Sequence, residues 1–306
     1  MTMLESHNAI LPILVLYKSM LRESASYRTF TAAAIHSKTD PSVIAVYDNS
    51  PSPRATDGDI AGLLAYKHDA HNGGLAAAYN WALDLALSRG FTWLLLLDQD
   101  SVLPIDFLDN LNQSASRYAA RDDVAAVLPH VWSGTAPVSP SRVRFARLSA
   151  VPASASGIPP YQLTGINSCA LVKVSFLQNI GGYSLDYPLD SLDHWAFNQM
   201  HLNGKKVVIS EAQITHDLSV LQFRKKVTIE RYRSILLGEA RFVTSYKRRC
   251  EVVAYLGRLL LRVAKQCIVY RNFRAALITV AMLVRIVATG KAASATVQRE
   301  GFPAVQ

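Results

Sequence analysis

The sequence has few cysteines and no long uninterrupted hydrophobic run. Its three cysteines, Cys169, Cys250 and Cys267, show no CxxC spacing, so neither a zinc ribbon nor a disulfide framework is indicated, and a reducing compartment fits. Arginine and lysine interrupt the apolar stretches after Val227, so none reaches the roughly 18 apolar residues that a membrane-spanning helix needs. These absences exclude a disulfide-stapled scaffold and a polytopic membrane protein.

Charged residues are also scarce, at 18%, while half of the residues are hydrophobic. This composition excludes a disordered chain, and 306 residues are enough to bury a substantial core. The opening MTMLESHNAI lacks the basic segment and the small-residue cleavage site of a secretory signal. We therefore expect a globular, cytoplasmic protein.

The charge that is present is mainly positive. The net charge is +9, and many basic residues lie between Arg224 and Arg285. Such an excess attracts phosphate groups of nucleic acids, lipid headgroups or nucleotides, and charge alone does not select among them. Because aliphatic rather than aromatic residues separate these basic side chains, we expect no nucleic-acid partner.

The N-terminal part of the chain alternates strand and helix patterns. Short apolar runs predict buried strands of a parallel sheet, and an Ala- and Leu-rich stretch at helical spacing predicts a helix. We expect strands at 10–16, 43–47, 63–66 and 91–97, and helices at 20–36 and 75–89, the last ending at Gly90. This order is typical of an open α/β sheet.

The signals beyond residue 100 are less regular. We expect helices at 106–118 and 192–202, strands at 124–128 and 206–209, and further regular structure within 163–174. Residues 133–160 are rich in proline and serine and predict a long loop, a feature that is usually functional in a compact domain. From residue 227 onward the pattern is helical and basic.

Two acidic residues follow the strand predicted at 91–97. This apolar run ends on Asp98-Gln99-Asp100-Ser101, which places both carboxylates at the carboxyl edge of the sheet, where open α/β sheets bind ligands. One carboxylate can coordinate Mg²⁺ or Mn²⁺ while the other binds ribose, water or a sugar. A solvated loop or a helix N-cap is the alternative, since Asp and Ser favour both.

Asn72-Gly73-Gly74 forms a second polar segment, directly before the Ala-rich helix. Backbone N–H groups and the helix dipole favour an anion or a polar ligand at such a position, and the glycines permit close approach. An ordinary turn at the start of a helix is the alternative.

Four segments together resemble the family 2 glycosyltransferases, particularly the rhamnosyltransferase-like members. They are YDNS at 47–50, HNGGLAAAYNWA at 71–82, LLLLDQDS at 94–101 and GINSCALV at 165–172. The resemblance covers roughly residues 10 to 218. It implies a GT-A fold, meaning a Rossmann-like mixed, mainly parallel sheet flanked by helices, together with an inverting mechanism, Mg²⁺ or Mn²⁺, and a nucleotide-sugar donor.

The resemblance also implies roles for individual residues. Asp48 would contact a pyrimidine base, although Asp-Asn-Ser-Pro is equally an ordinary turn composition. His216 would reach the metal or the diphosphate, although a lone histidine is more often structural. The implied donor contacts are Tyr17, Asp48, Asn72, Gly73, Gly74 and Asp98, and the implied metal ligands are Asp98, Asp100 and His216.

An inverting transfer needs a base that takes the proton from the acceptor hydroxyl. Asp193, at the start of a predicted helix where this family tends to place its base, is the candidate, and Asp190 is its competitor. The sequence departs from the family pattern at Trp195, where an acid is common. Either aspartate could instead cap the helix, and His194 and Trp195 could line an acceptor site or belong to the core.

These observations predict a GT-A catalytic domain at residues 1–222 and a basic amphipathic helical region at 223–306. We expect the enzyme to move rhamnose or another hexose from a dTDP- or UDP-sugar to a saccharide or lipid-linked acceptor, in cell-surface polysaccharide synthesis such as that of O-antigen. The helical region would contact the inner face of the membrane or pack on the catalytic domain.

Two other functions remain compatible with parts of the sequence. A catalytically degenerate transferase fold could act as a scaffold at the membrane, and the tryptophan at position 195 keeps this alternative open. A nucleotidyltransferase would share the metal-binding carboxylates, but the Gly- and Lys-rich loop expected near its N-terminus is not visible in ILPILVLYKSM.

Overall fold

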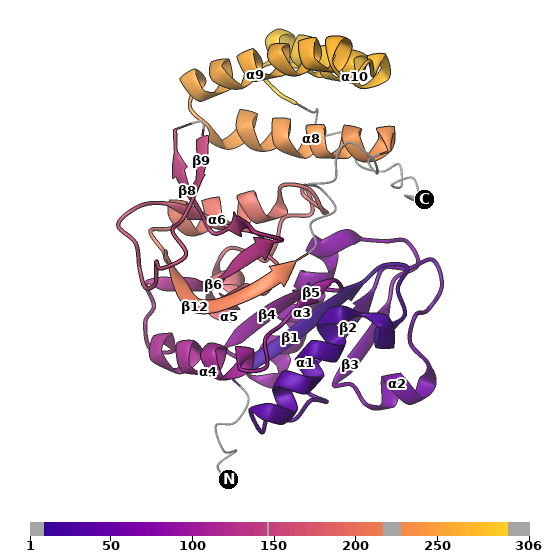
Figure 1. The fold of residues 1–306 in the computed structure, drawn as a ribbon, viewed down its shortest axis with the longest axis vertical. Coiled ribbons are helices and arrows are strands. Elements are labelled where there is room, and N and C mark those ends of the chain that lie inside the picture. The colour runs from indigo at the N-terminus through magenta and orange to yellow at the C-terminus, as the bar shows by residue number, and fades with distance from the viewer. Residues whose placement is uncertain (1–8, 146, 217–227, 293–306) are drawn as a thin grey trace.

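The computed structural model describes residues 9–145, 147–216 and 228–292, and shows an α/β core beneath a layer of helices (Figure 1). Within these residues, the main sheet has nine strands in the order β3-β2-β1-β4-β11-β6-β12-β5, with β7 paired to β6. The strands are β1 (Ile10–Leu16), β2 (Ala45–Asp48), β3 (Ala65–His68), β4 (Trp93–Asp98), β5 (Ser101–Val102), β6 (Val124–Ser133), β7 (Ala136–Ser139), β11 (Leu171–Lys173) and β12 (Lys206–His216).

Strands β3, β2, β1 and β4 are parallel neighbours, and β12 is parallel to β6, whereas β11 runs antiparallel between β4 and β6. The predicted fold class, a mixed and mainly parallel GT-A type sheet flanked by helices with a helical C-terminal region, is confirmed. A smaller sheet, in the order β10-β8-β9, consists of β8 (Ser141–Arg144), β9 (Arg147–Ala150) and β10 (Leu163–Thr164).

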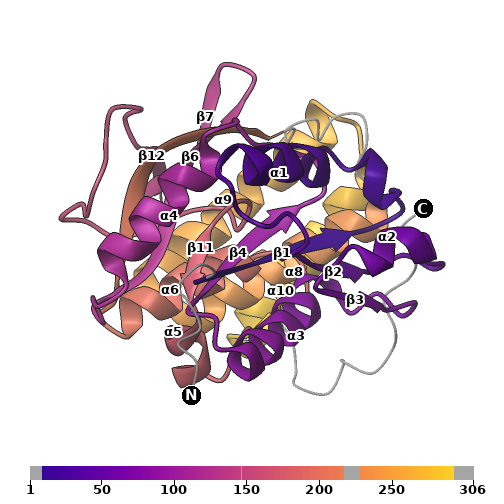
Figure 2. The ribbon, with the colours of Figure 1, turned by 90° about the horizontal axis from the view of Figure 1, so that it is seen from below.

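Helices cover both faces of the main sheet (Figure 2). Helices α1 (Ala25–His36) and α4 (Phe107–Tyr118) lie on one face, and α3 (Gly74–Arg89), α5 (Val174–Asn179) and α6 (Leu192–Leu202) belong to the core of the other. Successive side chains of β1 therefore enter different cores: Leu11 and Ile13 pack with α3, whereas Leu14 packs with α1 and α4. Burial on both faces explains why this strand is apolar throughout.

Two short helical elements complete the N-terminal half. The 3-10 helix η1 (Leu21–Glu23) precedes α1, so the helix predicted at 20–36 is divided at Ser24, whose side chain accepts a hydrogen bond from the backbone N–H of Tyr27. Helix α2 (Asp57–Ala61) begins with a capping box between Thr56 and Asp59.

Three predictions made from sequence are wrong between residues 124 and 216. The strand predicted at 124–128 continues to Ser133 as β6. Residues 133–160 are not one loop, because they contain β7, β8 and β9. Strand β12 does not end at Ile209 but continues to His216, since a register shift between Ile209 and Gln213 lets it resume pairing with β6. This continuation brings the end of β12 to β5, beside the acidic segment that follows β4.

The C-terminal helices α8 (Ile229–Tyr246), α9 (Arg249–Ile268) and α10 (Phe273–Thr289) form a layer with its own hydrophobic core. Figure 1 shows α8 next to α6 and the other two helices on the outside. Among the described residues, no helix is long and apolar enough to cross a membrane.

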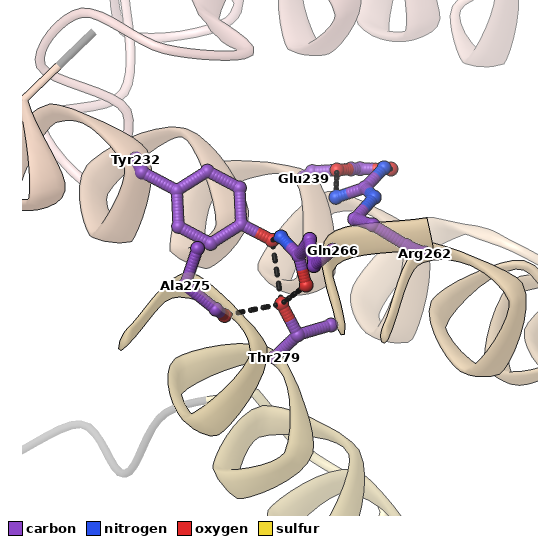
Figure 3. Close-up of polar contacts among 6 residues, drawn as sticks. All are labelled: Tyr232, Glu239, Arg262, Gln266, Ala275 and Thr279. Carbon is purple, nitrogen blue, oxygen red and sulfur yellow. Dashed lines mark hydrogen bonds and ion pairs between the residues drawn. The ribbon is translucent and has the colours of Figure 1, made fainter. Parts of the chain in front are cut away.

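A buried polar ring fixes the three helices relative to one another (Figure 3). Gln266 Nε2 donates to Tyr232 Oη at 2.8 Å, Tyr232 Oη lies 2.6 Å from Thr279 Oγ1, and Thr279 Oγ1 lies 2.9 Å from Gln266 Oε1. Beside this ring, Arg262 makes two hydrogen bonds to Glu239, at 2.9 and 3.0 Å. Because unpaired buried polar atoms are costly, this network favours one register of the helices.

Candidate functional site

The carboxyl ends of β1, β2 and β4 meet at one edge of the sheet, because these strands are parallel neighbours. Gln99 joins two of them: its side-chain oxygen accepts from the backbone N–H of Tyr17 at 2.8 Å, and its Nε2 lies 3.3 Å from the carbonyl oxygen of Tyr17. The backbone N–H of Lys18 donates to Ser50 Oγ at 2.8 Å. The loops that carry the predicted donor contacts are thus tied together.

Asp98 and Asp100 lie at this edge in different environments. Asp98 is half-buried and its Oδ2 accepts a hydrogen bond from the Ser168 hydroxyl, whereas Asp100 is exposed. The Ser26 hydroxyl donates to the backbone carbonyl of Asp98 and lies 3.0 Å from that of Ser101, which holds the turn between the two acids.

The chemistry of these two side chains fits a hard divalent cation. Mg²⁺ bound with substrate phosphates usually takes only one or two protein carboxylates. Among the described residues, no group of three or more His, Cys, Asp or Glu side chains is placed to hold a metal ion by itself. The backbone of His216 pairs with Ser101 across β12 and β5, so the structure brings this third predicted residue next to the acidic segment.

Asp48 is wholly buried, and its carboxylate is already engaged. Its Oδ1 accepts from the backbone N–H of Ser50 at 3.0 Å, while its Oδ2 accepts from the backbone N–H of Arg54 at 2.6 Å and from Tyr66 Oη at 2.7 Å. In this arrangement the carboxylate closes the turn after β2. Direct contact with a nucleotide base would require that turn to move.

The start of α3 is close-packed and internally hydrogen-bonded. The backbone N–H of Gly73 donates to Asp69 Oδ2 at 2.8 Å, and that of Gly74 donates to Asn49 Oδ1 at 3.3 Å. A Cβ on Gly74 would lie 2.3 Å from the carbonyl oxygen of Pro188. The amides that we expected to meet a ligand therefore bond to protein acceptors, and Gly74 brings the helix against the loop that leads to Asp193.

The two candidate bases differ in their partners. Asp190 forms a double hydrogen-bonded ion pair with Arg231 of α8, with N–O distances of 2.9 Å, and accepts from Ser234 Oγ at 2.8 Å. Burial raises the pKa of Asp190, although the Arg231 charge opposes this effect. Asp193 is half-buried, and its Oδ1 accepts from the backbone N–H of His194 at 2.7 Å.

Tyr79 of α3 connects the acidic segment with the start of α6. Burial is the main cause of the raised pKa of Tyr79. The negative charge of Asp98 raises it further, and that of Asp193 adds a smaller effect. Both carboxylates therefore lie within electrostatic range of one buried phenol. The backbone N–H of Ala76, near the start of α3, donates to the carbonyl oxygen of Pro188 at 3.2 Å, so the loop that leads to Asp193 packs against the helix that carries Tyr79.

His194 and Trp195 face the C-terminal helices. His194 Nδ1 lies 3.1 Å from Thr164 Oγ1, and the residue lines a cavity of about 230 Å³ together with Asn198 and Phe242. Trp195 is buried, and its Nε1 donates to Tyr246 Oη of α8 at 3.1 Å. Trp195, which stands where the resembling family commonly has an acid, therefore belongs to the core and links α6 to α8 through this hydrogen bond.

Three residues shape this site through contacts that were not predicted from the sequence: Asp69, Gln99 and Ser168. Asp69 caps the start of α3 and also accepts from Tyr47 Oη at 2.8 Å. Ser168 lies within the GINSCALV segment, but its contact with Asp98 joins positions 70 residues apart. Only the presence of polar residues in otherwise apolar segments could have indicated them.

Comparison with known proteins gives a distant likeness. No protein-family model matches the sequence, and neither does any curated protein. A solved structure of TarS residues 1–349 from S. aureus in complex with UDP-GlcNAc is 12% identical over 85% of this chain and 74% of that chain, with a TM-score of 0.47.

Two further structures give similar values. The longer TarS structure is 13% identical over 78% of this chain, with a TM-score of 0.46, and the match spans less than half of that protein, at 44%. A197 from STIV is 14% identical over 68% of this chain and 84% of that chain, with a TM-score of 0.39. Likenesses this distant identify no activity for this chain.

Proposed function

We propose that the chain is an inverting, metal-dependent glycosyltransferase that moves a sugar from a dTDP- or UDP-sugar to a saccharide or lipid-linked acceptor. The observation that carries the proposal is the position of Asp98 and Asp100 where β4 ends, beside the carboxyl ends of the parallel strands β1 and β2. The four segments that resemble family 2 glycosyltransferases supply the residues of this edge. Rhamnose is the donor sugar that the resemblance favours.

The donor would lie along the ends of β1, β2 and β4. Tyr17 and the turn closed by Asp48 would frame the nucleoside, and Asn72, Gly73 and Gly74 would shape the adjoining wall. Asp98 and Asp100 would hold Mg²⁺ or Mn²⁺, with His216 at the neighbouring strand position. When bound, the cation offsets the negative charge that develops on the leaving diphosphate.

Asp193 is the proposed general base. Its carboxylate would take the proton from an acceptor hydroxyl as the hydroxyl oxygen bonds to the anomeric carbon and the bond to the diphosphate breaks on the opposite face. Asp190 is better suited to positioning, since Arg231 and Ser234 occupy both of its carboxylate oxygens. The same network links the start of α6 to α8.

Turnover of candidate donors tests this proposal. Purified protein is incubated with dTDP-rhamnose, UDP-glucose or UDP-galactose, with Mn²⁺ or with EDTA, and release of the nucleotide is measured. We expect hydrolysis of one donor in the presence of metal, and Asp98→Asn or Asp100→Asn should lower its rate by about a hundredfold or more.

Asp84→Asn is the matched control, because Asp84 is exposed on α3 and the substitution removes the same charge. It should leave the rate unchanged. Metal-independent turnover, or turnover that survives Asp98→Asn and Asp100→Asn, would contradict the proposed site.

A further inference from the structure

The charge of this protein is concentrated in its C-terminal helical layer. Residues 228–292 contain thirteen Lys or Arg and three Glu, a net charge of +10, so the rest of the chain carries a net charge of −1 out of the total of +9. Helix α9 contains one acidic residue, Glu251, and α10 contains none. A large anionic surface is therefore favoured as a partner of this layer.

Large apolar side chains are also exposed on this layer. Leu261 is 73% exposed, Ile268 is 77% exposed and Leu277 is 69% exposed. The exposed apolar residues, which we call the outer apolar face, are Val253, Leu260, Leu261, Ile268 and Val269 of α9 and its C-terminal end and Phe273, Leu277, Val280, Val284 and Val287 of α10.

The spacing of these residues shows that α10 is apolar on two sides. The outward residues from Phe273 to Val287 recur every three or four positions, while Ala275 and Ile286 point into the helical core. A helix that is hydrophobic all round is normally covered on each side. The core of the helical layer covers the inner side of α10, so an apolar partner is expected on its outer side.

A groove of about 1110 Å³ joins the outer apolar face to basic side chains. It lies between α8, α9 and the start of α10, and its lining includes Arg258, Lys265 and Arg274 as well as Leu261 and Val269 of the apolar face. The lining also contains the Arg262–Glu239 pair, so four basic residues face one carboxylate. Apolar surface beside cations is the composition that suits an interface with anionic lipids.

We propose that the outer apolar face of α9 and α10 docks on a bilayer containing anionic phospholipid, with the basic side chains of the groove meeting its headgroup phosphates. A second copy of this chain is a poorer occupant, because two layers of charge +10 would repel each other. The helices lie on the surface rather than cross it, since no described helix can span. The docked layer would hold α6 and the sheet edge close to the membrane.

Flotation with lipid vesicles tests this proposal on the full chain without any nucleotide sugar, so its outcome is independent of the proposed transferase activity. We expect binding to vesicles of phosphatidylcholine mixed with phosphatidylglycerol, weaker binding to phosphatidylcholine alone, and loss of binding as salt is raised. The combined variant Arg258→Gln, Lys265→Gln, Arg274→Gln should lower affinity by about two orders of magnitude.

The combined variant Leu261→Ser, Ile268→Ser, Leu277→Ser should lower vesicle binding by about tenfold or more. Its matched control is Ile35→Ser, Leu202→Ser, which removes side chains of similar exposure, 65% and 61%, from the sheet domain and should leave binding unchanged. Leu277→Trp keeps the face apolar, and its added fluorescence should shift to shorter wavelength with mixed vesicles even if the serine variant fails to fold.

Three results would overturn the proposal. They are no binding of the folded wild-type chain to mixed vesicles, equal binding by the wild type and the folded serine variant, and a lipid-free dimer that the serine variant converts to a monomer in sedimentation velocity. The last result would assign the outer apolar face to a second copy.

Discussion

Asp190 and Asp193 stand three positions apart but have different surroundings, which illustrates how much a residue's role depends on its partners. Asp190 is bonded to Arg231 and Ser234, both from α8. Asp193 accepts a hydrogen bond from the backbone of its own helix, and its charge, like that of Asp98, contributes to the raised pKa of Tyr79. A base must have a carboxylate that a substrate can reach, and this condition favours Asp193.

Substitution of each aspartate should therefore have a different effect. Asp193→Asn should lower the rate of sugar transfer by about a thousandfold while nucleotide binding and unfolding are unchanged, because only the proton acceptor is lost. Asp190→Asn should lower the free energy of unfolding by about 1–3 kcal/mol, because Arg231, whose side chain is 23% exposed, loses its counter-charge.

Single-turnover transfer and urea unfolding, measured on both variants, separate these effects. The assignment of the base would be wrong if Asp190→Asn abolished transfer at unchanged stability while Asp193→Asn remained active.

At the scale of elements, the start of α3 depends on a glycine for two reasons. Gly74 has φ +79°, and a Cβ at this position would lie 2.3 Å from the Pro188 carbonyl oxygen. Gly90, at the end of the same helix, has φ +76° but no atom within 4 Å of a Cβ. Comparison of Gly74 with Gly90 therefore separates two free-energy costs of adding a side chain: strain in the left-handed backbone, which both positions share, and the steric clash, which only Gly74 has.

We expect Gly90→Ala to destabilise by about 1–2 kcal/mol through backbone strain alone. Gly74→Ala should lower the free energy of unfolding by the same amount and by about 1–3 kcal/mol more, because α3 and the loop at Pro188 must move apart. Urea unfolding of the two variants measures the difference, and equal losses would show that the packing of α3 against this loop contributes little.

The elements also show where sequence reasoning succeeded. Helix α6 begins at Leu192 and ends at Leu202, as predicted, and β4 ends on the acidic segment because burial on both faces keeps its residues apolar up to Leu97. Strands β8 and β9 were missed because they are four residues each and have no fully buried residue: three residues of β8 are half-buried and β9 is exposed throughout, so neither shows an alternating burial pattern. Their pairing is a tertiary property that composition does not encode.

The site was predictable only in part for a related reason. The positions of Asp98 and Asp100 could be predicted because both residues stand where the apolar run of β4 ends, and the end of a strand lies at the edge of its sheet. The engagement of Asp48 by Tyr66 and Arg54, and of Asp190 by Arg231, depends on contacts between distant segments. No single-sequence pattern distinguishes a carboxylate with such partners from an open one.

At the scale of the whole molecule, the helical layer is both packed on the sheet domain and open on its far side. Helix α8 contacts the loop before α6 through the Asp190–Arg231 pair, and α6 itself through the hydrogen bond from Trp195 to Tyr246. Helices α9 and α10 expose the outer apolar face. Of the two alternatives considered from sequence, packing on the sheet domain describes the inner side of this layer, and the proposed membrane contact concerns the opposite side. The boundary at residue 222 stays a prediction.

The proposed transferase activity requires that the sheet edge bind a pyrimidine nucleotide together with a divalent cation. Calorimetric titration of UDP and of dTDP into the folded protein tests it most directly, with and without Mn²⁺, beside Asp100→Asn and the control Asp84→Asn. We predict binding of at least one nucleotide, weakened about tenfold or more when Mn²⁺ is omitted or Asp100 is replaced. If neither nucleotide binds, the transferase account is contradicted and a scaffold at the membrane becomes the better description.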